Sequence, residues 1–136
     1  MKHSYKIPCS TAHLKELRLF LGKVLSGLNL GNVDQNSLIL AVDEVCANII
    51  IHSNCDEGES IEMNVIPSKD KIIFEIIDGA SNGFDINAYD APELQEIIKT
   101  RRKGGIGLML VKKIMDKIEV DQVNDKNCCR LYKSIN

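Results

Sequence analysis

Residues 38–52, LILAVDEVCANIIIH, decide the fold because they combine a helical apolar pattern with polar residues at fixed spacing. Asp34, four residues before this stretch, is a suitable N-cap for a helix that ends near His52. The apolar positions recur every three or four residues, as on one face of an α-helix; they are Leu38, Val42, Val45 and Ile49. The stretch therefore predicts a long helix with one face in a hydrophobic core.

The segments on either side of this helix predict strands as well as a further helix. Residues 4–9 predict a short strand, and Ser10 or Thr11 can cap the helix that follows. Two alternating runs, 60–66 and 71–77, are joined by a Pro-Ser-Lys-Asp turn and predict a β-hairpin. The apolar stripe of the first helix is Leu14, Leu17, Leu21, Val24 and Leu28.

The second half of the chain begins with a polar, glycine-marked segment at 78–103, in which a short helix is expected near 92–100. A connecting segment of this length within a compact domain suggests a lid. Gly104-Gly105 then opens a third long helix, and a closing hairpin pairs 118–123 with 128–135. The residues of the third helix expected to face the core are Leu110, Val111, Ile114 and Met115.

The predicted order is strand, helix, helix, hairpin, lid, helix, hairpin. This order predicts an α+β fold, a two-layer α/β sandwich in which an antiparallel-rich mixed sheet is covered on one face by helices. The 136 residues fit a single domain spanning 1–136, and a hydrophobic content of 44% suffices for one core.

Composition argues against several classes of function. The 17 basic residues nearly balance the 19 acidic ones, giving a formal charge of -2, and there is no basic stripe that would grip a nucleic-acid backbone. No apolar run approaches the roughly 20 residues of a membrane span. The five cysteines show no CxxC or zinc spacing and are expected to be small core residues. We therefore expect a cytoplasmic protein that binds neither nucleic acid nor membrane directly.

Polar residues on the long helix suggest a metal site. Glu44 and Asn48 lie four apart, about 6 Å along the helix axis, with His52 in the same line. A carboxylate and a carboxamide at this spacing suit Mg²⁺, which takes oxygen ligands. Spacing alone nevertheless favours a solvated helix face over a metal site.

Two further groups stand at a helix start and at a strand end. Gly104 to Gly107 occupy a predicted helix N-terminus, where free amides and the helix dipole favour an anion such as phosphate. Arg101 to Lys103 precede them, and these side chains either close on phosphates or form a charged, solvated turn. Asp78 ends an apolar strand and can accept a hydrogen bond from a base amine, although aspartate at a strand end is also a common turn residue.

Taken in order, these motifs resemble the successive nucleotide-binding boxes of the histidine-kinase-like ATPase superfamily. The boxes are Asp43-Glu44-Val45-Cys46-Ala47-Asn48, then Asp78-Gly79 with Phe84-Asp85, then Gly104-Gly105-Ile106-Gly107-Leu108. Within that superfamily, the short length, residues 44–52 and residues 104–116 are most similar to anti-sigma-factor serine-protein kinases. The resemblance runs from about Leu14 to Ser134.

This resemblance implies a role for each matching residue. Glu44 would orient or deprotonate the attacking serine hydroxyl, Asn48 would help to hold Mg²⁺ on the triphosphate of ATP, and Asp78 would recognise the adenine amine. Residues 87–103 would form the lid over bound ATP. The residues implied in nucleotide binding are Asn48, Asp78, Gly79, Ala80, Phe84, Arg101, Lys103, Gly104, Gly105, Ile106, Gly107 and Leu108.

The resemblance also implies partners, namely a sigma factor, an anti-anti-sigma protein phosphorylated on serine, and a second copy of the chain in a homodimer. An apolar excess on the first helix at Leu19, Phe20 and Leu25 suggests dimerisation or sigma binding, and a helix that is simply well buried explains it equally well.

Two other functions are weighed against the kinase. The family has glycine two places after the adenine-binding aspartate, whereas here Ala80 stands there, the glycine is Gly79, and Phe84 arrives about one residue late. A methyl group at that place weakens or reshapes ATP binding, which leaves open a non-catalytic nucleotide-binding module that sequesters a sigma factor or another regulator. A sensor-kinase fragment with His13 as phosphoacceptor is disfavoured, because no Glu-Pro pair follows this histidine and a second dimerisation helix is lacking.

Overall fold

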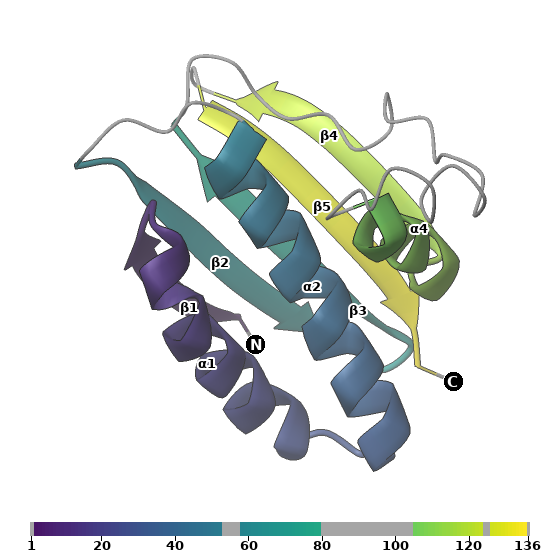
Figure 1. Cartoon of the computed structure of the whole chain (residues 1–136). Helices are drawn as coiled ribbons and strands as arrows, with labels where there is room; N and C mark the ends of the chain where they lie inside the picture. Colours follow the sequence, from purple (N-terminus) through teal and green to yellow (C-terminus); the bar gives the residue numbers. More distant parts are fainter. Residues whose placement is uncertain (1, 53–57, 80–104, 124–125, 136) are drawn as a thin grey trace.

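The computed structural model describes residues 2–52, 58–79, 105–123 and 126–135. Within these ranges the chain forms two layers, a sheet and a set of helices packed on one of its faces (Figure 1). In chain order the elements are β1 (His3–Pro8), a 3₁₀ turn (Thr11–His13), α1 (Leu14–Ser26), α2 (Asn32–His52), β2 (Ser60–Pro67), β3 (Lys71–Asp78), α4 (Gly105–Ile114), β4 (Lys117–Val123) and β5 (Lys126–Ser134). The expected two-layer α+β fold is confirmed.

The sheet has five strands in the order β1-β2-β3-β5-β4. Both predicted hairpins are present, and they meet where β3 pairs with β5. Every described pairing is antiparallel, so the expectation of a mixed sheet is wrong in that detail. The register places Asp78, the last residue of β3, opposite Asn127 of β5.

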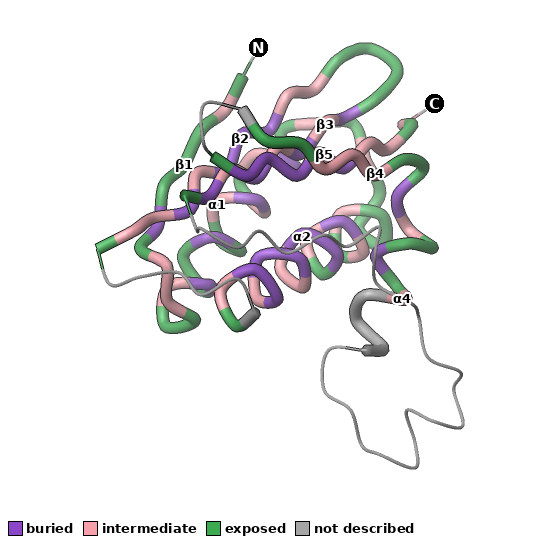
Figure 2. Tube along the Cα trace, turned by 90° about the horizontal axis from the view of Figure 1, so that it is seen from above, coloured by how far each residue is buried: buried purple, intermediate pink, exposed green. Residues whose placement is uncertain are grey.

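The core lies between α2 and the middle of the sheet. All four residues of the predicted α2 stripe are buried, none more than 2% exposed. On the sheet, alternate residues point toward the helices, as the two-residue period of a strand requires; they include Ile61, Met63, Val65, Ile72, Phe74 and Ile76. Figure 2 shows the buried residues of the two layers facing each other.

Helix α1 corrects one expectation about surface residues. Ser10 accepts a hydrogen bond from the amide of Ala12 and caps the 3₁₀ turn, so the α-helix proper begins at Leu14. Leu25, which was expected to add to an exposed apolar surface, is fully buried. Phe20 is half-buried, and its ring stacks on that of Tyr5 with 5.1 Å between the ring centroids. Of these three residues, only Leu19 adds apolar surface, since its side chain is 66% exposed. The reason is that α1 packs against both β1 and α2 and so buries a wide face.

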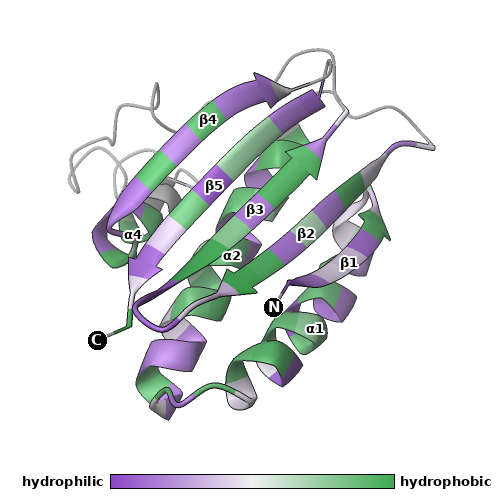
Figure 3. Ribbon diagram, turned by 180° about the vertical axis from the view of Figure 1, so that it is seen from behind, coloured by the Kyte–Doolittle hydropathy of each residue, from purple (hydrophilic) through white to green (hydrophobic). Residues whose placement is uncertain are grey.

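No described helix covers the other face of the sheet, where a polar row crosses all five strands (Figure 3). Its hydrogen bonds run from Ser4 Oγ to Asn64 Oδ1 at 2.6 Å, from Asn64 Nδ2 to Glu75 Oε1 at 2.9 Å, and from Arg130 Nε to Glu75 Oε2 at 3.1 Å. Neighbouring side chains bury Asn64 completely although it lies on this open face. Cross-strand pairs of this kind help to fix strand register.

One strand boundary, one helix residue and the cysteines differ from expectation. Strand β5 begins at Lys126 because the β4–β5 ladder continues to its pairing with Val123. On α4, Leu110 is 36% exposed rather than in the core, whereas Val111, Ile114 and, just after the helix, Met115 meet the core as expected. Cysteines 46, 128 and 129 are buried and carry no disulfide, as expected of small core residues, whereas Cys9 is disulfide-bonded, so that expectation is wrong at one position.

The lid at 87–103 and the short helix near 92–100 lie outside the described residues. None of the described helices combines the length and the apolarity that a bilayer span requires.

The packing of α1 predicts opposite outcomes for two leucines on the same helix. Leu25→Ala should lower the free energy of unfolding by about 2–5 kcal/mol, because it removes a fully buried side chain and leaves a cavity. Leu19→Ala should change it by less than about 0.5 kcal/mol, because that side chain is already in solvent. Urea unfolding of both variants measures the difference, and equal losses would mean that α1 is turned differently on the sheet.

Candidate functional site

Helix α2 holds Glu44 and Asn48 together as one unit. The side-chain amide of Asn48 donates to the backbone carbonyl of Glu44 at 2.8 Å and to Glu44 Oε1 at 3.1 Å. Asn48 is only 4% exposed, whereas Glu44 is half-buried. A solvated helix face would expose both side chains, so that alternative is wrong at Asn48. Because the amide nitrogen is used in these bonds, the carbonyl oxygen is the group of Asn48 with the character of a metal ligand.

Asp78 is a buried carboxylate at the end of β3. It is 3% exposed, and its Oδ1 accepts a hydrogen bond from Asn127 Nδ2 at 3.2 Å. Burying a carboxylate is costly unless hydrogen bonds compensate, so this contact has a structural value of its own. The predicted closing hairpin leaves Asn127 in the turn between 123 and 128, and no pattern in the sequence pairs it with a residue 49 positions earlier.

Cys46 is buried in the core cluster that also contains Ile76 and Cys129, which pair with each other two residues before Asp78 on β3. Burial raises the pKa of the Cys46 thiol well above its ordinary value, and electrostatic interactions with Asp43, Cys129 and Asp78 raise this pKa further. Cys46 lies two residues from Glu44 on one side and two from Asn48 on the other. The α2 segment from 44 to 48 and the end of β3 therefore meet in one region of the domain.

The helix that carries the predicted anion-binding start also packs against α2. Helix α4 begins at Gly105, as expected, and packs against α2 (Figure 1). Ile106, Gly107 and Leu108 form its first turn, where backbone amides have no partner within the helix. Lys133 Nζ donates to the carbonyl of Ile114 at 2.9 Å and satisfies the other end of α4.

Of the remaining predicted site residues, Gly79 lies within the described ranges and the others lie outside them. Gly79 follows β3 and is exposed, and an added Cβ there would meet only Glu59 Oε2 at 3.8 Å, an ordinary contact. Space therefore does not require glycine at this position. The predicted site residues outside the described ranges are Ala80, Phe84, Arg101, Lys103 and Gly104.

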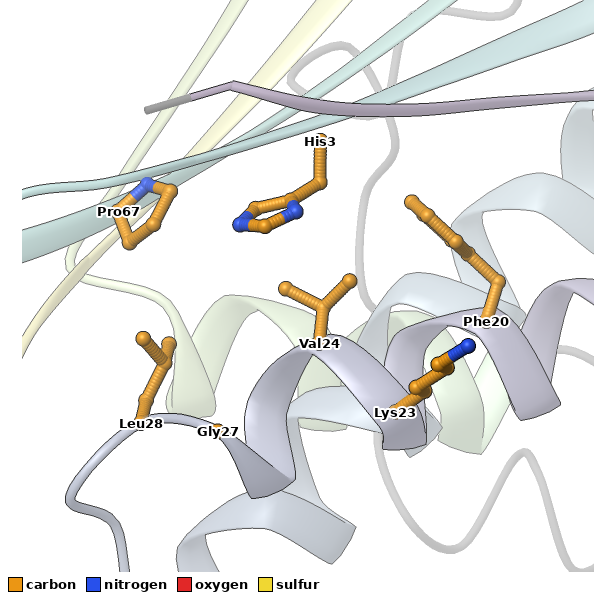
Figure 4. Close-up of a pocket in the computed structure, with 7 residues that line it drawn as sticks. All are labelled: His3, Phe20, Lys23, Val24, Gly27, Leu28 and Pro67. Atoms are coloured by element: carbon orange, nitrogen blue, oxygen red, sulfur yellow. The ribbon is translucent and has the colours of Figure 1, made fainter.

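A cavity of about 600 Å³ lies elsewhere, between α1 and the β1–β2 edge of the sheet (Figure 4). None of the described residues that line it is a carboxylate that would hold a cation or accept from a base amine. The lining residues are His3, Phe20, Lys23, Val24, Gly27, Leu28 and Pro67. This hollow is therefore separate from the region around Glu44 and Asp78.

Comparison with known proteins agrees with this arrangement. Residues 7–133 match the family described as the histidine kinase-like ATPase domain. The chain belongs to this family. The match includes α2, the end of β3 and α4, which are the elements that carry the Glu44–Asn48 pair, Asp78 and the glycine-rich helix start.

Similar proteins include several named serine-protein kinase RsbW. The chain is 29% identical over 121 residues to that of Bacillus velezensis, covering 85% of this chain and 74% of the relative. It is 24% identical over 120 residues to that of Halalkalibacterium halodurans, covering 85% and 73%. It is 26% identical over 126 residues to that of Staphylococcus aureus, covering 85% and 76%.

The buried thiol of Cys46 predicts a pH dependence of stability. Because its folded-state pKa is raised above the ordinary value of 9.0, the unfolded chain loses this proton first as the pH rises. The contribution of the thiol to stability is therefore complete below pH 9 and is lost above it, by at most about 1.4 kcal/mol per pH unit.

Denaturant unfolding of the parent and of Cys46→Ala between pH 7 and 10.5 measures this dependence. The difference in unfolding free energy between the two should be constant up to about pH 8.5 and then shrink. A difference that stays constant to pH 10.5 would contradict the raised pKa.

Proposed function

We propose that this protein is an anti-sigma factor and a serine-protein kinase, which binds Mg-ATP and phosphorylates a serine of an anti-anti-sigma partner. The observation that carries the proposal is the Glu44–Asn48 pair, a carboxylate and a carboxamide joined at 3.1 Å on the helix that passes Asp78. The names of the similar RsbW proteins support the same activity.

The donor atoms on α2 fit magnesium. Mg²⁺ takes oxygen ligands and is usually held by one or two protein groups together with substrate phosphates and waters. Asn48 offers its carbonyl oxygen to the ion, and the backbone amides at the start of α4, Gly105 and Gly107 among them, donate hydrogen bonds to the phosphates. When bound, the ion neutralises charge on the transferring phosphoryl group.

Glu44 acts on the serine hydroxyl. Asn48 holds one carboxylate oxygen of Glu44, while the side chain stays half exposed and is accessible to a partner. Glu44 accepts the hydroxyl proton as the new bond forms between the serine oxygen and the γ-phosphorus, and the bond from that phosphorus to ADP breaks. The products are phosphoserine and ADP.

Asp78 recognises the base. A buried carboxylate accepts strongly from the exocyclic amine of adenine, and guanine presents a carbonyl at that place. Asn127 acts as a positioning residue, since its hydrogen bond fixes the carboxylate from the far side of the β3–β5 pair. Gly79, Ala80 and Phe84 complete the base pocket in this proposal, and Arg101, Lys103 and Gly104 contact the phosphates.

The proposal extends to assembly and place. The protein sequesters a sigma factor as a homodimer in the cytoplasm, and phosphorylation of the anti-anti-sigma partner maintains that sequestration. The substitution of Ala80 for the family glycine supports one alternative, a nucleotide-binding module that sequesters a regulator without transferring phosphate.

Replacement of Glu44 distinguishes the kinase from the module. Glu44→Ala should lower the rate of serine phosphorylation at least about 100-fold, because it removes the group that accepts the hydroxyl proton. The dissociation constant for Mg-ATP should change by less than about threefold, as measured by calorimetry. Asp70→Ala is the control, since Asp70 lies in the turn at the opposite end of β3 from Asp78. A parent that binds Mg-ATP and transfers no phosphate to the anti-anti-sigma protein would favour the module.

Base recognition is tested at the buried pair. Asp78→Asn should weaken ATP binding about tenfold to a hundredfold, because a hydrogen bond to a charged group contributes about 1.5–3 kcal/mol. Asn127→Ala should weaken it less, since the carboxylate remains but is less well oriented. Calorimetry with ATP and GTP measures both variants, with circular dichroism to verify folding. If Asp78→Asn keeps the parental ratio of ATP to GTP affinity, Asp78 does not recognise the base.

A further inference from the structure

Helix α2 carries exposed apolar residues along its outer side. Val33, Leu40 and Ile51 are 79%, 49% and 62% exposed. They are separated by seven and eleven residues, and at 3.6 residues per turn both separations return to within about 20° of the same direction. These residues therefore form a line along the face of α2 that is turned away from the sheet.

Glu44 lies on the same side of α2, between two of these residues. It is four residues after Leu40 and seven before Ile51, which places it about 6 Å and about 10 Å from them along the helix axis. A group that approaches the Glu44 carboxylate from solvent along this face of the helix therefore passes Leu40 or Ile51.

Helix α1 lies on a different flank of α2. Arg18 Nη1 donates to Asp43 Oδ1 at 3.1 Å, and Asp43 is about 100° around the helix from Glu44. The apolar side chains that flank Glu44 are therefore those of α2 itself. We call Leu40 and Ile51 the apolar collar of Glu44.

We propose that the apolar collar is the docking surface for the phosphoacceptor protein, whose serine is flanked by apolar side chains of its own. This inference rests on the proposed function, because it is the role of Glu44 that requires a hydroxyl-bearing protein at this place. Single exposed leucines are ordinary, but here they stand on both sides of the carboxylate that the substrate must meet. An apolar contact around the serine also excludes water, which would otherwise compete with it as phosphoryl acceptor.

Glutamine substitutions test the docking surface. Leu40→Gln and Ile51→Gln replace exposed side chains by a residue of good helix propensity, so folding should be retained. With the purified anti-anti-sigma protein as substrate, each should raise KM at least about fivefold, change kcat less than about twofold, and leave the dissociation constant for Mg-ATP unchanged. Ile66→Gln is the control, because Ile66 lies on the opposite, open face of the sheet and alternates with the buried Val65.

The outcomes separate the docking surface from the kinase activity itself. If the parent phosphorylates the partner and both variants keep the parental KM, the docking surface is overturned and the kinase stands. If the parent transfers no phosphate, both are overturned. If light scattering shows that the parent is a dimer and the variants are monomers, while KM is unchanged, the collar binds a second copy of the chain. That result also overturns the proposal.

Discussion

The burial of α2 against the sheet sets the geometry of the whole candidate site. Val45 and Ile49 lie in the core, which fixes the rotation of the helix about its axis. Asn48 is then about 60° from Val45 around the helix, at the border of the core, and Glu44 is about 40° further out. The observed burial follows this order, since Asn48 is 4% exposed and Glu44 is half-buried. The apolar stripe thus determines how deeply each polar group sits.

Polar groups in the interior have different roles on the two faces of the sheet. On the open face, Asn64 bridges carboxylates of Glu62 and Glu75, and Arg130 supplies a compensating positive charge. That network sets one guanidinium against two carboxylates, and its cross-strand hydrogen bonds help to fix strand register. Under the helices, Asp78 has an amide donor from Asn127, and the nearby Cys46 thiol stays protonated because its pKa is raised. A region with an excess of negative charge is suited to a cation or a donor from a ligand.

Sequence patterns predicted those features that depend on local periodicity. The α2 stripe, both hairpins and the helix start at Gly105 follow from spacing within one segment, and each is present. Leu25 was misplaced because one apolar stripe cannot reveal that α1 is covered on two sides. Asn127 was missed because its contact with Asp78 joins positions far apart in the chain, which no local pattern reports. The disulfide at Cys9 was missed because the cysteine spacing matches no recognised motif.

The site itself was predicted from the order of motifs rather than from any single one. Spacing alone favoured a solvated face for Glu44 and Asn48, and the burial of Asn48 contradicts that interpretation. The roles of Glu44, Asn48 and Asp78 stay predictions, because geometry shows which groups meet and not which reaction they perform. The predicted residues between 80 and 104 add nothing to this comparison, since they lie outside the described ranges.

Helix α2 has an inner and an outer face with different requirements. The inner face is apolar for the core, Asn48 lies at its border, and the outer face combines Glu44 with the exposed Val33, Leu40 and Ile51. A helix that only covered a sheet would gain solubility from charged residues on that outer face. Burying an apolar side chain in a partner contributes roughly 25 cal/mol for each Å² removed from water, and that gain is available only when the partner is present. Exposed aliphatic residues on both sides of Glu44 therefore have a physical use if a protein substrate covers them, and a weak, reversible contact is what a kinase that must release its product requires.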